Sequence, residues 1–91
     1  MSEEKPSLEE LIDFPATFTF RAVADASPSI KGHCERAVEK ALDRKVIQTA
    51  SQPSKNGRFC SVRVTATVIN ADEVRAAYAA IHALDGIKML L

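Results

Sequence analysis

The chain is poor in aromatic residues and carries no excess of either charge. It has no tryptophan, one tyrosine and four phenylalanines, and its twelve basic residues equal its twelve acidic ones. Without surplus lysine and arginine, a protein cannot neutralise the many phosphates that non-specific nucleic-acid binding requires. Sheet-based RNA-binding domains also stack bases on two or three aromatic side chains of the open sheet face, where we expect this sequence to place only Phe59. We therefore expect no nucleic-acid partner.

Long apolar runs are also missing from the sequence. No run approaches the roughly 20 apolar residues that a membrane-spanning helix needs. The sequence begins Met-Ser-Glu-Glu-Lys-Pro, which is acidic and polar and unlike a signal peptide. We expect no membrane partner and a cytoplasmic location.

Cysteine is scarce, with Cys34 and Cys60 as the two examples. Both fall on faces that the local pattern predicts to be buried, and no histidine shares those faces. Their spacing does not match a metal site. We interpret them as buried, reduced thiols, and we expect neither a metal nor a cofactor.

The chain length of 91 residues predicts one domain, because it leaves no room for a second core. We expect residues 1–6 to be a flexible tail and residues 7–91 to form that domain. Ser7 is the predicted N-cap of a short helix, with Glu10 three residues later.

The clearest structural signal is the alternation of small apolar and polar residues from Phe59 to Val68. A period of two predicts a strand with one face in the core and the other toward water or a partner. A similar stretch, Thr17–Val23, predicts a second strand. The predicted inward residues are Phe18, Phe20, Ala22, Cys60, Val62, Val64, Ala66 and Val68; the outward ones are Thr17, Thr19, Arg21, Phe59, Ser61, Arg63, Thr65 and Thr67.

Two segments carry the apolar spacing of amphipathic helices. The first is expected to start with Ser27 as N-cap and Pro28 at the first helical position. The second starts at Asn70, with Glu73 completing a capping box, and ends at Gly86, which supplies a positive φ. The predicted apolar stripe of the first helix is Ile30, Cys34, Ala37, Val38, Ala41 and Leu42. That of the second helix is Val74, Ala77, Tyr78, Ile81 and Leu84.

Two weaker strands complete the pattern. Lys45–Ser51 is predicted as a strand in which Val46, Gln48 and Ala50 share the inward phase and Ile47 faces outward. Ile87–Leu91 is predicted as a strand in which Ile87, Met89 and Leu91 share the inward phase. The order β-α-β-β-α-β with right-handed crossovers predicts an α+β, ferredoxin-like sandwich. It has a four-stranded antiparallel sheet, two helices on one face and a short N-terminal helix.

Several stretches resemble one known family. Leu11–Pro15 with Phe18–Phe20, the loop and strand Pro53–Val62, and the final segment Ile87–Leu91 are similar to the YbeD-like family of small bacterial proteins of unknown function. The resemblance implies a fold similar to ACT regulatory domains. One departure is Phe59, where a tyrosine is usual. The resemblance supplies no catalytic residues.

A first candidate binding surface comprises three cations. Arg21, Arg63 and Lys88 are all predicted to project from the helix-free face of the sheet, on three different strands. Such a patch suits a carboxylate or phosphate ligand, or the acidic surface of a partner. The alternative is a solvated face that keeps charges for solubility.

A second candidate is the loop from Ser54 to Ser61. It combines Ser54, Lys55, Gly57 and Ser61 with the outward-facing Phe59, and loops on rigid scaffolds often carry recognition residues. The spacing does not match a P-loop, because a strand follows rather than a helix. The alternative is a purely structural hairpin.

The sequence offers no nucleophile and base that can be placed together, and His33 and His82 are predicted as surface residues on different helices. We therefore do not expect an enzyme. The favoured hypothesis is a small regulatory or interaction module that binds a small effector or forms a homodimer through a sheet edge. The alternative is a stand-alone protein-binding adaptor without a small-molecule ligand.

Overall fold

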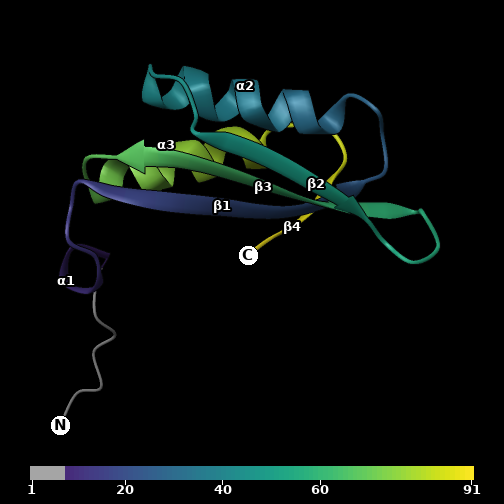
Figure 1. Ribbon diagram of the computed structural model, residues 1–91, viewed down its shortest axis with the longest axis horizontal. Helices are drawn as coiled ribbons and strands as arrows, with labels where there is room; N and C mark the ends of the chain where they lie inside the picture. The colour runs from purple at the N-terminus through teal and green to yellow at the C-terminus, as the bar shows by residue number, and fades with distance from the viewer. Residues whose placement is uncertain (1–7) are drawn as a thin grey trace, which may run out of the picture.

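One sheet and two long helices form two layers in the computed structural model, which describes residues 8–91 (Figure 1). In chain order the elements are α1 (Leu8–Leu11), β1 (Ala16–Asp25), α2 (Ile30–Leu42), β2 (Gln48–Pro53), β3 (Phe59–Val68), α3 (Ala71–His82) and β4 (Ile87–Leu90). The antiparallel sheet has the order β2-β3-β1-β4, and α2 and α3 cover the same face. This is the predicted ferredoxin-like arrangement. The tail predicted for residues 1–6 and the cap at Ser7 lie outside the described residues.

The central strands β1 and β3 pair over their whole lengths, from Ala16 opposite Val68 to Asp25 opposite Phe59. The predicted alternation is confirmed, and the inward residues pack beneath the two helices. The buried residues of the two strands are Phe20, Ala22, Ala24, Cys60, Val62, Val64, Ala66 and Val68.

None of the described helices is long and apolar enough to cross a membrane.

Helix α2 begins two residues later than the sequence predicted, because its N-cap is Ser29 and not Ser27. Ser27 stabilises the preceding turn instead. Its hydroxyl accepts a hydrogen bond from the Ser29 N–H at 3.3 Å, and its carbonyl accepts one from the Ile30 N–H at 3.4 Å. This i to i+3 bond closes a tight turn around Pro28 ahead of the α-helix. The buried stripe agrees with the prediction: Ile30, Cys34, Val38 and Leu42.

Helix α3 begins at the predicted cap, where the Asn70 side chain accepts a hydrogen bond from the Glu73 N–H at 2.9 Å. The return bond differs from a standard capping box. The Glu73 carboxylate accepts the N–H of Ile69, at 2.9 Å, rather than that of Asn70. Gly86 has the predicted positive φ, at 87°, but α3 ends earlier than predicted, at His82 with Ala83 as its C-cap, so Gly86 belongs to the turn before β4.

Strand β2 begins at Gln48 rather than at Lys45, so the predicted strand is displaced toward the C-terminus. The reason lies at Val46, whose N–H donates to the Glu39 carboxylate at 3.1 Å. A side chain of α2 therefore takes the backbone donor that a strand would have used for pairing.

The register of β2 also corrects the predicted phase of that strand. Gln48 lies opposite Thr65, and Ala50 lies opposite Arg63. Because Thr65 and Arg63 face away from the helices, Gln48 and Ala50 face away as well. The prediction that they share an inward phase with Val46 was wrong.

Strand β4 pairs with β1 through a register shift. Ile87 and Met89 lie opposite consecutive residues of β1, so Lys88 is the extra residue of a β-bulge. As a result, Met89 is 53% exposed while Leu90 packs against the core. The predicted inward phase of Ile87, Met89 and Leu91 was wrong beyond Ile87, because the bulge reverses the alternation.

Candidate functional site

Two arginines face each other on the helix-free face of the sheet. Arg21 of β1 lies directly opposite Arg63 of β3. The carbonyl of Arg21 accepts the N–H of Leu91 at 2.9 Å, so the backbone polar groups of Arg21 point toward β4 rather than β3. Arg21 and Arg63 therefore form a non-hydrogen-bonded antiparallel pair, in which the Cα atoms approach to about 4.5 Å and the side chains lie closest.

This arginine pair carries uncompensated charge. Within the described part of the chain, no carboxylate lies within ion-pair distance of Arg21 or Arg63. Like charges placed directly opposite each other destabilise an antiparallel pair. Ala50, the β2 residue opposite Arg63, has a side chain too small to cover it. Both guanidinium groups are therefore available to an anion.

Two shallow hollows flank the arginine pair, with volumes of about 250 and 170 Å³. Guanidinium groups bind carboxylates and phosphates through parallel N–H donors, and hydroxyl and amide groups add further hydrogen bonds. The surface therefore has the donors that a small anion requires. Besides the two arginines, the larger hollow is lined by Thr19, Gln48, Ala50 and Thr65, and the smaller by Ala22, Gln52, Ser61, Val62 and Leu91.

Lys88, the third cation of the predicted patch, lies apart from the arginine pair. Its Nζ is 3.5 Å from a carboxylate oxygen of Asp25. Asp25 is four residues beyond Arg21 along β1, which corresponds to about 13 Å of strand. Of the three cations predicted to form a patch, the structure therefore brings only Arg21 and Arg63 together, and Lys88 is balanced by Asp25.

The loop between β2 and β3 is held closed by its own polar groups. The Ser54 hydroxyl donates to the Asn56 side-chain oxygen at 3.1 Å and accepts the N–H of Phe59 at 3.1 Å. Gly57 has a φ of 75°, and Lys55 is exposed. The Ser54 hydroxyl is thus engaged within the hairpin, and a ligand at the loop would have to displace these bonds.

Phe59 stands at the end of the open face, where the Arg58 guanidinium carbon lies 5.6 Å from its ring centroid. Ser61 is the next outward residue of β3 and reaches the smaller hollow. Of the residues predicted for binding, the structure brings Arg21, Arg63 and Ser61 together, places Ser54, Lys55, Gly57 and Phe59 at the hairpin end, and separates Lys88.

The cysteines lie in the core, both buried and unpaired. Burial, and to a smaller extent nearby Cys60, raises the pKa of the Cys34 thiol to about 11. His33 and His82 are exposed on different helices. Among residues 8–91 no three histidine, cysteine, aspartate or glutamate side chains are grouped to hold a metal ion. Cys34 is therefore protonated at neutral pH and behaves as a small apolar side chain.

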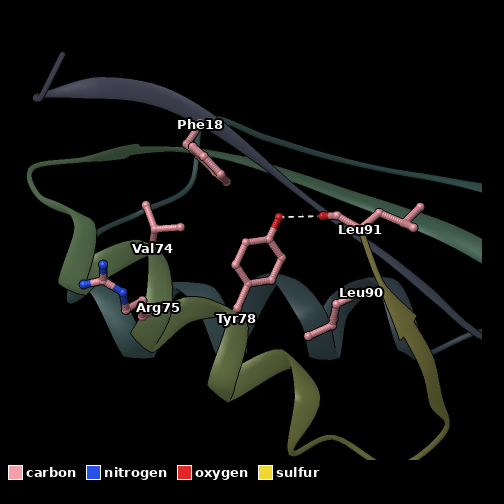
Figure 2. A pocket seen from close by; sticks show the side chains of 6 residues that line it. All are labelled: Phe18, Val74, Arg75, Tyr78, Leu90 and Leu91. Atoms are coloured by element: carbon pink, nitrogen blue, oxygen red, sulfur yellow. Dashed lines mark hydrogen bonds between the residues drawn. The ribbon is translucent and has the colours of Figure 1, made fainter. Parts of the chain in front are cut away.

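A second concave surface lies where α3 meets β1 and β4. This α3 groove has a volume of about 590 Å³ and is largely apolar. In Figure 2 the rings of Phe18 and Tyr78 and the side chain of Val74 surround one space, with the Arg75 guanidinium at its margin. The lining residues are Phe18, Val74, Arg75, Tyr78, Leu90 and Leu91.

The hydroxyl of Tyr78 closes one end of the α3 groove. It donates to the carbonyl of Leu91 at 2.7 Å (Figure 2). Burial raises the pKa of Tyr78, whereas the backbone N–H and the positive charge of Arg21 act to lower it. The hydroxyl therefore lies beside Arg21, at the point where the pairing of β1 with β4 ends.

The sequence did not indicate the glutamines of the open face or the α3 groove. Gln48 was assigned to the inward phase, and the bulge that turns Leu90 inward has no local signature. The available signal was the spacing of Gln48, Ala50 and Gln52, which alternate polar, small and polar at a period of two. That spacing indicates an outward row only once the register of β2 is known.

The sheet, its two covering helices and its open polar face define a small α+β module of the ferredoxin-like class. The chain belongs to the DUF493 family, described as proteins of unknown function, whose model matches residues 9–91. It is 30% identical over 82 residues to a UPF0250 protein of Shewanella loihica, covering 90% of this chain and 92% of that protein. It is 29% identical over 87 residues to a UPF0250 protein of Yersinia pestis, covering 96% and 99%. The resemblance to the YbeD-like family is confirmed.

Solved structures show the same architecture. The solution structure of protein HP0495 from Helicobacter pylori matches with a TM-score of 0.76 and 22% identity, covering 97% of this chain and 89% of that one. Uncharacterized protein TM1266 from Thermotoga maritima matches with a TM-score of 0.57 and 6% identity, covering 82% and 92%. At these identities the likeness concerns the fold alone.

Proposed function

We propose that the protein is a small regulatory module that binds an anionic ligand between Arg21 and Arg63. The observation that supports this proposal is the close cross-strand pairing of two arginines without a carboxylate partner among the described residues. Departures from favourable local pairing are expected mainly at functional sites. A carboxylate or phosphate between the guanidinium groups relieves their repulsion, so ligand binding increases the stability of the fold.

The ligand class follows from the lining of the two hollows. Two arginines supply the charge, while Thr19, Thr65 and Gln48 supply neutral hydrogen-bonding groups. These groups suit an organic acid or a small phosphorylated metabolite. The described residues that line the hollows include no histidine, cysteine, aspartate or glutamate. The proposal is therefore for binding rather than catalysis.

Self-association is the second part of this proposal. We infer that a bound ligand acts by changing the oligomeric state of the protein. β2 is an edge strand, and Ile47 beside it is 59% exposed. We expect two copies to pair along β2, with Ile47 in the contact. Ile47→Lys should then shift the sedimenting species from dimer to monomer. A wild-type protein that sediments as a monomer at every concentration would contradict this part of the proposal.

The experiment measures the melting temperature against inorganic phosphate, citrate, amino acids and nucleotides, one at a time. A ligand at 100 times its dissociation constant should stabilise the fold by about 2.7 kcal/mol. For a domain of this size that corresponds to a rise of about 10–20 °C. Without ligand, Arg63→Gln should melt at a higher temperature than the wild type, because it removes the repulsion from Arg21.

The matched control is Lys88→Gln, which removes a cation that lies outside the arginine pair. Arg63→Gln should abolish the ligand-induced rise, whereas Lys88→Gln should retain it. A ligand-induced rise in melting temperature that Arg63→Gln retains would refute the proposed site. A flat panel, with no rise for any compound, would instead favour an adaptor that binds only proteins.

A further inference from the structure

Part of β1 has a free edge beside the α3 groove. β4 pairs with β1 only opposite Ala22–Ala24, and the N–H of Leu91 reaches the carbonyl of Arg21. β1 continues from Arg21 back to Ala16, beyond the end of β4. Among residues 8–91, this stretch pairs with β3 on one side and with no strand on the other.

Within the free edge, the backbone groups of Thr17 and Thr19 point away from β3. Successive residues of an antiparallel strand direct their N–H and C=O groups to opposite neighbours. Arg21 and Asp25 direct theirs toward β4, and Thr17 and Thr19 share their parity. Among residues 8–91, the N–H and C=O groups of these two threonines have no hydrogen-bond partner.

The corresponding position on the far side of the central pair is occupied. Thr67 of β3 lies opposite Thr17 and extends beyond the start of β2. Its carbonyl accepts a hydrogen bond from Arg44 at 2.8 Å. The Arg44 side chain thus satisfies a backbone carbonyl at one edge of the central strand pair. Among residues 8–91, the backbone groups of Thr17 and Thr19 at the other edge have no such partner, and they lie beside the apolar α3 groove.

We propose that an extended segment of a partner protein adds to this edge, antiparallel to β1 and in line with β4. Phe18, between the two threonines, lines the α3 groove, so alternate side chains of an added strand also face that groove. The occupant therefore carries a large apolar side chain that enters the groove. This docking site is independent of the arginine pair proposed above. Its hydrogen bonds come from the free edge of β1, whereas the two arginines project from the open face of the sheet.

The chemistry of the groove further defines the occupant. Arg75, at the margin of the groove, already pairs with Asp72 at 3.0 Å, and the other lining side chains are apolar except for the Tyr78 hydroxyl. The groove therefore accepts apolar rather than charged side chains. The partner segment is an extended strand that alternates apolar and polar residues, with the apolar ones facing the groove.

The probe is a capped heptapeptide with the sequence Glu-Leu-Thr-Leu-Thr-Leu-Glu, titrated into the full chain and followed by NMR. Free protein should show fast amide hydrogen exchange at Thr17 and Thr19 and slow exchange at Phe18, which pairs with β3. The peptide should produce saturable shifts at Thr17 and Thr19, with a dissociation constant of about 1 mM or lower, and should slow their exchange. Absence of a saturable shift would overturn the proposal.

The control peptide is N-methylated on the alternate amides that face β1, which removes donors but keeps every side chain. It should bind about tenfold more weakly, because each lost hydrogen bond weakens binding by a factor of a few. Equal binding would show that the groove alone attracts the peptide, and would refute strand addition. Peptide-dependent shifts confined to another surface would refute it as well.

Protein variants test the same edge from the other side. Thr17→Pro removes an outward donor without removing a β1–β3 ladder bond, and proline is tolerated at such edge positions. The matched control is Thr67→Pro, whose lost N–H faces the opposite margin. Thr17→Pro should weaken the peptide and Thr67→Pro should not. A self-association that Thr17→Pro abolishes would assign the edge to a second copy and overturn the peptide proposal.

Discussion

Arg44 and Glu73, 29 residues apart, are joined by two parallel hydrogen bonds: Arg44 Nη1 lies 2.7 Å from Glu73 Oε1, and Nη2 lies 2.9 Å from Oε2. The same Arg44 Nη1 donates to the carbonyl of Thr67. Glu73 also accepts the N–H of Ile69. One ion pair therefore connects the loop after α2, the end of β3 and the first turn of α3.

The first prediction concerns the pH dependence of this connection. Hydrogen bonds from Arg44 hold the pKa of Glu73 below its ordinary value of 4.5, against the opposing effect of burial. A lowered pKa contributes stability that is present above about pH 4.5 and is lost as pH falls through the folded-state pKa. Glu73→Gln should therefore lower the melting temperature at about pH 7 and narrow its difference from wild type at about pH 3.

The matched control for this experiment is Asp72→Asn, one residue away. Asp72 pairs with Arg75 but its side chain is 91% exposed, so its loss should change the melting temperature little. A constant difference between wild type and Glu73→Gln across the pH range would contradict the prediction.

The second prediction concerns the N-cap of α3. Asn70→Ala removes the acceptor of the Glu73 N–H and should reduce the free energy of unfolding by about 1 kcal/mol. Asn70→Ser keeps a side-chain oxygen and should lose much less. Urea denaturation of the three proteins measures both values. Equal losses for alanine and serine would show that the cap bond contributes little.

The third prediction concerns the aromatic cluster in the core. Phe20 is 1% exposed, and its ring centroid lies 4.8 Å from that of Phe18 and 5.0 Å from that of Tyr78. Phe20→Ala should reduce the free energy of unfolding by about 3–5 kcal/mol through lost burial and the cavity left behind. Phe20→Leu keeps most of the apolar volume and should lose clearly less. Denaturant midpoints that coincide for the two variants would contradict this account.

The fourth prediction separates backbone strain from packing at two glycines. Gly57 has a φ of 75° and no atom within 4 Å of an added Cβ, so Gly57→Ala should cost about 1–2 kcal/mol through the backbone alone. Gly32→Ala, within α2, should gain about 0.4–1 kcal/mol, because the nearest atom is the flexible end of Arg36. Opposite signs in chemical denaturation are the expected result, and a common sign would refute the distinction.

The fifth prediction concerns thiol reactivity. Cys34 is buried with a pKa raised to about 11, and Cys60 is 8% exposed. Neither thiol should react rapidly with a disulfide reagent in the native protein at neutral pH, and both should react in denaturant. Because the Cys34 pKa is raised on folding, stability should fall as pH rises above its ordinary value of 9.0. A rapid reaction of one thiol in the native state would show that the core opens there.

The sequence by itself determined the secondary-structure order and most of the core. The period-two alternation of Phe59–Val68 and the helical spacing of residues such as Val74 and Ile81 reflect burial on one face, which each element specifies locally. The cap at Asn70 and the positive φ at Gly86 were predictable for the same reason. A ferredoxin-like sheet follows from that order with the usual crossover rule.

Only the tertiary structure decided how the elements meet. The Glu39 carboxylate of α2 takes the N–H of Val46, which therefore does not pair in β2. Pairing with the distant strand β1 forms the bulge at Lys88, which reverses the phase of β4. The register then places Arg21 opposite Arg63, separates Lys88 from them, and leaves Thr17 at a free edge. Strand register depends on pairing energies summed across the sheet, and a shift of one residue moves every side chain to the other face. That dependence is the physical reason why the sites emerge from the fold and not from the local pattern.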